Sequence, residues 1–101
     1  MKRVTFIIPK NDNNGAPFPT ATIAEIRKDI LRSFGGYTVR DVRGEWVDGE
    51  GRTYQDDNWE YTIVMEEKEV EKVESILAKT KRLLDQQAMW LEVSDTEAKS
   101  V

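Results

Sequence analysis

The sequence predicts one α+β domain in which strands and helices follow the order β-α-β-β-α-β. Two segments with helical periodicity flank a central pair of strand-like segments within residues 34–65. A turn rich in Gly and Asp separates this pair, which predicts a long β-hairpin. A short apolar segment lies outside each helix and supplies the remaining two strands.

The first strand is predicted over residues 4–8, where Val4, Phe6 and Ile8 would share one face. Residues 10–19 are dense in Asn, Asp, Gly and Pro and predict a loop. The first helix is predicted over residues 22–34. Thr22 and Glu25 have the spacing of a capping box, and Gly35 suits the left-handed residue after the helix. Its apolar stripe comprises Ile23, Ile26, Ile30, Leu31 and Phe34.

The second strand does not alternate regularly. Tyr37 and Val39 are in phase with one another, but Val42 is not. A β-bulge near Arg40 and Asp41 would restore the alternation, so we expect one there. The third strand, residues 59–65, alternates regularly.

The second helix is predicted over residues 66–87, with acidic residues early and basic residues late, as the helix macrodipole favours. The last strand is predicted over residues 89–93. Residues 94–101 are polar, and we expect a flexible tail. The predicted domain therefore spans residues 1–93.

Two right-handed crossovers around a hairpin predict a ferredoxin-like sandwich, with an antiparallel sheet in the order 4-1-3-2 and both helices on one face. Nothing in the chain remains to cover the other face of the sheet. That face is half apolar, which predicts a homo-oligomer formed through the open sheet face. Its expected residues are Thr5, Ile7, Thr62, Val64 and Trp90.

The composition excludes several kinds of site. The chain has no Cys and no His, so thiolate chemistry and the usual neutral-pH general base are absent. We expect no bound metal and no cofactor. The net charge of -4 argues against nucleic acid as a partner. No segment is apolar enough to predict a signal peptide or a membrane span, so the expected location is the cytoplasm.

The element order, the long hairpin containing Gly44-Glu45-Trp46 and the acidic turn resemble the PII-type signal proteins and the CutA-type trimers. This resemblance implies a ferredoxin-like fold whose sheets pack around a threefold axis. The chain also resembles small uncharacterised bacterial proteins, which imply no assigned activity. That resemblance is carried by Asp12-Asn13-Asn14-Gly15, Phe34-Gly35-Gly36-Tyr37-Thr38, Gly44-Glu45-Trp46 and Asp56-Asp57.

Arg40, Arg43, Glu45 and Trp46 are the candidate ligand-binding residues, because two Arg beside a Trp can hold an anion and stack a planar ring. The alternative is cross-strand pairing with Glu60 around a partly buried Trp.

Asp12 is a further candidate, because its Asn- and Gly-rich turn offers oxygen ligands. The alternating spacing of a calcium loop is missing, and a solvated turn is the alternative. The acidic residues of the hairpin tip could include an acid–base pair, or they form a solvated turn. They are Glu45, Asp48, Glu50, Asp56 and Asp57.

These observations favour a non-enzymatic, oligomeric binding or regulatory module that takes a small anionic or nucleotide-like ligand or a protein partner. The alternative is an inhibitor carried by a phage or mobile element, which sequesters a signal molecule or blocks a host protein. An enzyme that uses carboxylates alone is the third interpretation.

Overall fold

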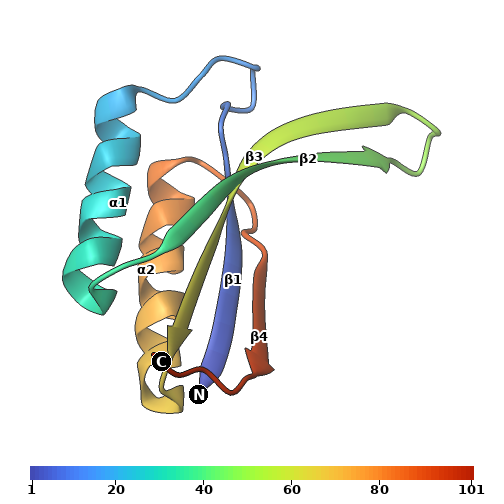
Figure 1. Cartoon of the computed structure of the whole chain (residues 1–101). Helices are drawn as coiled ribbons and strands as arrows, with labels where there is room; N and C mark the ends of the chain where they lie inside the picture. Colours follow the sequence, from blue (N-terminus) through green and yellow to red (C-terminus); the bar gives the residue numbers. More distant parts are fainter.

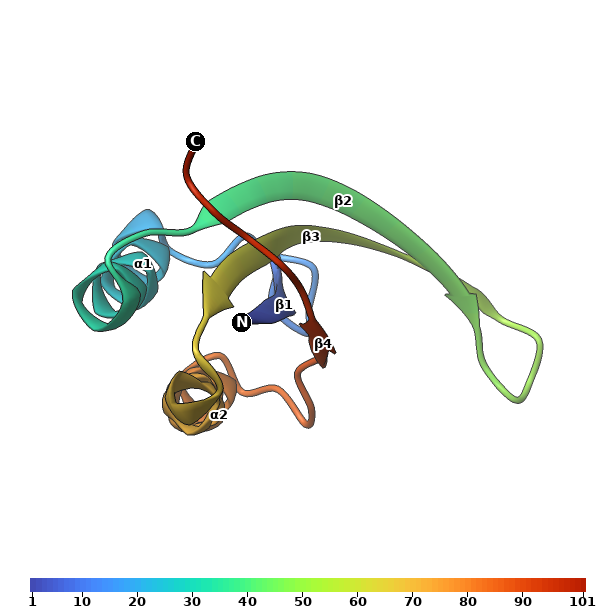
Figure 2. The ribbon, with the colours of Figure 1, turned by 60° about the horizontal axis from the view of Figure 1, so that its bottom comes forward.

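The computed structural model describes residues 1–101. Its four strands form one antiparallel sheet in the order β2-β3-β1-β4, and both helices cover the same face (Figures 1 and 2). This arrangement confirms the predicted ferredoxin-like sandwich. The elements are β1 (Lys2–Pro9), α1 (Thr20–Phe34), β2 (Thr38–Val47), β3 (Thr53–Met65), the 3-10 turn η1 (Glu67–Glu69), α2 (Val70–Leu83) and β4 (Leu91–Asp95).

The hydrophobic core lies between the sheet and the two helices. Every second residue of β1 and β3 faces the helices, as the strand period of two requires. The rings of Phe6 and Tyr61 stack at 5.2 Å in its centre. The buried apolar residues are Val4, Phe6, Ile8, Ile23, Ile26, Ile30, Tyr61, Ile63, Met65, Val73, Leu77 and Leu84.

The central hairpin is longer than the rest of the sheet. β2 and β3 pair without interruption from Thr38 opposite Thr62 to Val47 opposite Thr53. β1 pairs with β3 only as far as Asn58, so residues 43–57 project from the body as a two-stranded arm (Figures 1 and 2).

The predicted bulge near Arg40 is wrong, because the β2–β3 register is continuous there. The break in the sequence pattern has a simpler cause. Val39 lies opposite Tyr61 and faces the helices, whereas Val42 lies on the open face. Both side chains are half-buried, so β2 carries an apolar residue on each of its faces. The strand therefore needs no inserted residue to explain why Val39 and Val42 are out of phase.

The predicted capping box of α1 is also wrong. α1 begins at Thr20, and no side chain caps it. The carbonyl of Pro19 instead accepts the backbone N–H groups of Thr22 and Ile23, at 3.0 and 3.3 Å. The other end agrees with the sequence. Gly35 has φ 80° and donates its N–H to the carbonyl of Leu31, as a left-handed cap does.

The end of α2 differs from the prediction. The helix ends at Leu83 rather than at residue 87, and Asp85 turns the chain with φ 53°. β4 accordingly starts later than expected and takes Ser94 and Asp95 from the expected tail. Neither α1 nor α2 has the length and hydropathy of a membrane-crossing helix.

Candidate functional site

The unbroken ladder separates the predicted site residues. Because side chains alternate along β2, Arg40 and Trp46 lie on the open face and Arg43 and Glu45 on the helix-side face. A bulge near Arg40 would have shifted the strand phase and could have brought these side chains to one face, but the register is continuous. Without a bulge, the four residues do not form one site.

Both Arg side chains are engaged across the hairpin. Arg40 donates from Nε and Nη2 to Glu60 Oε1 at 2.7 Å, and Arg43 donates from Nε to Asp57 Oδ1 at 3.3 Å. Glu45 accepts from Gln55 Nε2 at 3.4 Å. This is the cross-strand pairing that the sequence left open as the alternative to an anion site.

The structure does bring together Trp46 and Asp12. They line a hollow of about 390 Å³ between the loop after β1, the base of the arm and the segment that leads into β4. We call this hollow the arm-base pocket. Its lining also includes Asp56, Asn58, Gln86 and Trp90.

The arm holds Trp46 in place from two sides. Its Nε1 donates to Asp56 Oδ2 at 2.7 Å, and its ring stacks on Tyr54 at 4.3 Å with 15° between the planes. Trp46 remains 51% exposed despite these contacts. The arm therefore presents a fixed aromatic surface to the pocket.

The tip of the arm is ordered by Asp48. Its carboxylate accepts the backbone N–H groups of Arg52 and Glu50 and the hydroxyl of Tyr54. Hydrogen bonding to the Arg52 backbone, with smaller contributions from Glu50 and Tyr54, lowers the pKa of Asp48 below its usual value. The carboxylate thus fixes the ring on which Trp46 stacks.

The opposite wall of the pocket is held by a chain of hydrogen bonds. Asp12 Oδ1 accepts the backbone N–H groups of Asn14 and Ala16, both at 2.9 Å, and so closes the turn. Asn13 Nδ2 donates to the carbonyl of Asp85 at 3.0 Å, and Gln86 Nε2 donates to Asn13 Oδ1 at 3.3 Å. These contacts join the loop after β1 to the turn after α2.

The charge of the arm-base pocket is opposite to that of the anion-binding site expected from the sequence. Its 12 lining residues include two carboxylates, Asp12 and Asp56, and neither Lys nor Arg. Each carboxylate has an oxygen that accepts no hydrogen bond from the protein. The pocket therefore attracts cations and repels anions. No group of three or more potential metal ligands of the His, Cys, Asp and Glu types occurs in the structure.

Gln86 and Asn58 line the pocket but were not among the candidate residues predicted from the sequence. Gln86 was placed inside a helix that in fact ends three residues earlier. Trp90 was assigned to the open face but not to a site. No local pattern could link it to Trp46, because the two belong to segments that only the folded sheet brings together.

No family model matches this sequence, and no curated protein matches it either. Its fold is nevertheless shared with solved structures. A phage SAM lyase in complex with S-methyl-5'-thioadenosine superposes with a TM-score of 0.69 and 12% identity, over 93% of this chain and 80% of that one. CutA1 from Pyrococcus horikoshii gives a TM-score of 0.67 and 14% identity, over 99% and 87%.

A PII-like CutA protein from Nostoc sp. PCC 7120 gives a TM-score of 0.63 and 8% identity, over 96% of this chain and 82% of that one. At such low identity these similarities establish the fold alone. They confirm the predicted likeness to PII-type and CutA-type proteins in architecture.

Proposed function

We propose that this chain is a homo-oligomeric small-molecule-binding module whose ligand is planar, nucleoside-like, and neutral or cationic. The observation that carries the proposal is the arm-base pocket, which combines the indoles of Trp46 and Trp90 with two carboxylates and contains no basic residue. This modifies the sequence-based expectation of a small anionic ligand and keeps the expectation of a nucleotide-like one.

The chemistry of the pocket suits such a ligand. An aromatic base stacks on an indole, and such stacking contributes about 1–3 kcal/mol per base. The amides of Asn58 and Gln86 supply donors and acceptors for the base, and the free carboxylate oxygen of Asp12 accepts from a ribose hydroxyl. A sulfonium or ammonium group gains further from the carboxylates and the indole faces. The nucleoside thioether held by the phage lyase of the same fold supports this class of ligand.

Calorimetric titration with three ligands tests the proposal. We expect S-methyl-5'-thioadenosine and S-adenosylmethionine to bind. We expect ATP to bind at least about tenfold more weakly at the same ionic strength, because its phosphates meet two carboxylates. Tightest binding by ATP, or no binding by any of the three, would contradict the proposal.

A second candidate is an enzyme that cleaves S-adenosylmethionine. The phage SAM lyase with the same fold favours it, as does a pocket whose charge suits a sulfonium. Chromatography after incubation with S-adenosylmethionine decides between the two. Multiple turnovers to S-methyl-5'-thioadenosine, absent in Asp56→Asn, would establish an enzyme. Recovery of intact S-adenosylmethionine at one per site supports binding or sequestration, which is how a phage-borne inhibitor would act.

An anionic ligand has a different place to bind. Arg3 and Arg40 line a second hollow, of about 340 Å³, on the open face. Arg3 has no ion-pair partner, and Arg40 shares its charge with Glu60. ATP binding that is lost in Arg40→Ala, but retained in the control Lys79→Ala, would place the ligand there. Arg43 lies on the opposite face and is not expected to contribute.

Oligomerisation rests on the open face. Val64 and Trp90 are 37% and 61% exposed there, beside the half-buried Ile7. The arm adds a second reason, because an isolated two-stranded ribbon is only marginally stable in water. A second copy that packs on this face would bury both features.

We therefore expect sedimentation velocity at micromolar concentration to show a species larger than the 11.7 kDa chain. Val64→Lys should shift the protein toward the monomer, because it buries a charge in the interface. Val101→Lys is the matched control at an exposed position and should have no effect. A wild-type protein that sediments only as a monomer would refute this part of the proposal.

A further inference from the structure

We propose that the outer edge of β4, together with the groove between it and α2, binds an extended peptide of another protein as a fifth strand. This inference does not depend on the arm-base pocket or on its ligand. It rests on unpaired backbone groups, an apolar groove and two unpaired charges at the rim of that groove.

β4 is an edge strand with its outer side open. The bonds from Ile7 N–H to the Trp90 carbonyl and from Thr96 N–H to the Met1 carbonyl show which residues of this strand face β1. Because hydrogen bonding alternates in an antiparallel pair, the backbone groups of Leu91 and Val93 point outward. An added strand would satisfy them, as in β-strand addition.

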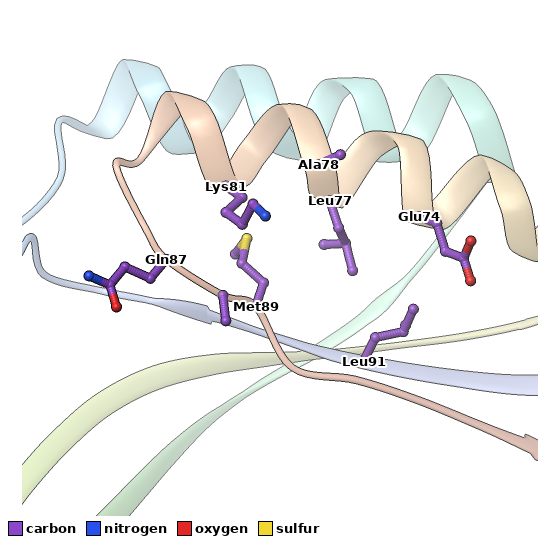
Figure 3. Close-up of a pocket in the computed structure, with 8 residues that line it drawn as sticks. Glu74, Leu77, Ala78, Lys81, Gln87, Met89 and Leu91 are labelled. Atoms are coloured by element: carbon purple, nitrogen blue, oxygen red, sulfur yellow. The ribbon is translucent and has the colours of Figure 1, made fainter.

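A groove of about 300 Å³ lies beside this edge. Figure 3 shows Leu77 and Ala78 of α2 on one side of it and Met89 and Leu91 on the other. We call it the β4 groove. Its walls are mainly apolar, so it suits an aliphatic side chain of the added strand.

The rim of the β4 groove carries opposite charges at its two ends. Glu74 lies over Leu91 and Lys81 lies over Met89 (Figure 3). Neither takes part in an ion pair, although ten such pairs occur in the structure. Both charges are therefore free for a partner.

These positions predict a peptide pattern. Glu74 and Lys81 are separated by two helical turns, about 10 Å, while alternate residues of a strand are about 6.7 Å apart. A peptide with a basic, an apolar and an acidic residue at alternate positions roughly fits this spacing. Its base would lie at Glu74, its apolar side chain in the β4 groove and its acid at Lys81. A strand antiparallel to β4 passes Glu74 first, so the order is basic, apolar, acidic from the N-terminus.

A second copy of this chain fits the β4 groove poorly. A second copy has two free edges, β4 and β2. The side chains of its β4 that alternate in line with the outward backbone groups are Leu91, Val93 and Asp95, and none of them is basic. The outward backbone groups of its β2 belong to residues with side chains on the helix-side face. Along that face Asp41, Arg43 and Glu45 follow one another, with no apolar residue between a base and an acid. The occupant we infer is therefore a peptide from a different protein.

Fluorescence anisotropy with two labelled peptides tests the inference. One seven-residue peptide has Lys, Leu and Glu at its second, fourth and sixth positions and Thr elsewhere, and the control exchanges Lys and Glu. We expect the first to bind at least about tenfold more tightly, as two charge contacts predict. In the charge-swapped double variant Glu74→Lys, Lys81→Glu the preference should reverse.

Equal binding of the two peptides, or no binding of either, would overturn the inference. Amide exchange supplies an independent readout. The N–H groups of Leu91 and Val93 should exchange fast in the free protein and slow down when the Lys–Leu–Glu peptide is added. Slow exchange of both in the free protein would show that the edge is already covered by a second copy, and would equally overturn the inference.

Discussion

Replacing Leu84 by Ala should lower the free energy of unfolding by about 2–5 kcal/mol, whereas replacing its neighbour Leu83 by Ala should change it by less than about 0.5 kcal/mol. Leu84 is 2% exposed and belongs to the core, and Leu83 is 55% exposed. The two variants remove the same atoms from adjacent residues, so their difference isolates burial. Urea unfolding followed by Trp fluorescence measures both.

Leu84 also supports the candidate site. It is the last core residue before Asp85, whose carbonyl accepts a hydrogen bond from Asn13. A cavity at this position should therefore loosen the wall of the arm-base pocket that carries Gln86. Equal losses of stability in the two variants would mean that Leu84 is not buried as the structure has it.

The fold could be predicted from the sequence because its periodicities are local. The alternation of Val4, Phe6 and Ile8 and the helical spacing of Ile23, Ile26 and Ile30 each identify an element without knowledge of the others. Gly35 marked the end of α1 for the same reason. Element boundaries were less predictable, because polar residues after α2 remain compatible with a helix until Asp85 adopts a positive φ.

The candidate site could be predicted only in part. Trp46 and Asp12 were identified by residue type, and the structure places both in the arm-base pocket. Arg43 was grouped with them because it is close in sequence, but strand alternation places it on the other face. A one-residue difference in strand phase reverses every side chain, and only the register of the folded sheet fixes that phase.

The other large expected effect concerns the charge of the ligand. Asp56→Asn should weaken binding of S-adenosylmethionine by about tenfold to a hundredfold, because a charge-assisted contact contributes about 1.5–3 kcal/mol. The Asn side-chain oxygen can still accept the hydrogen bond from Trp46 Nε1, so the indole should keep its place. Binding of the uncharged S-methyl-5'-thioadenosine should change by less than about threefold. Calorimetry with both ligands measures the difference.

Asp57→Asn is the matched control, because it makes the same chemical change one residue away, on the helix-side face, where Asp57 pairs with Arg43. It should leave the affinity for both ligands unchanged. Trp46→Ala should instead weaken the binding of both ligands, since each would lose the same stacking surface. If Asp56→Asn weakened the binding of both ligands equally, Asp56 would act by positioning Trp46 rather than through its charge. If neither Asp56→Asn nor Trp46→Ala altered binding, the ligand would not occupy the arm-base pocket, and the hollow beside Arg3 and Arg40 would become the site to test.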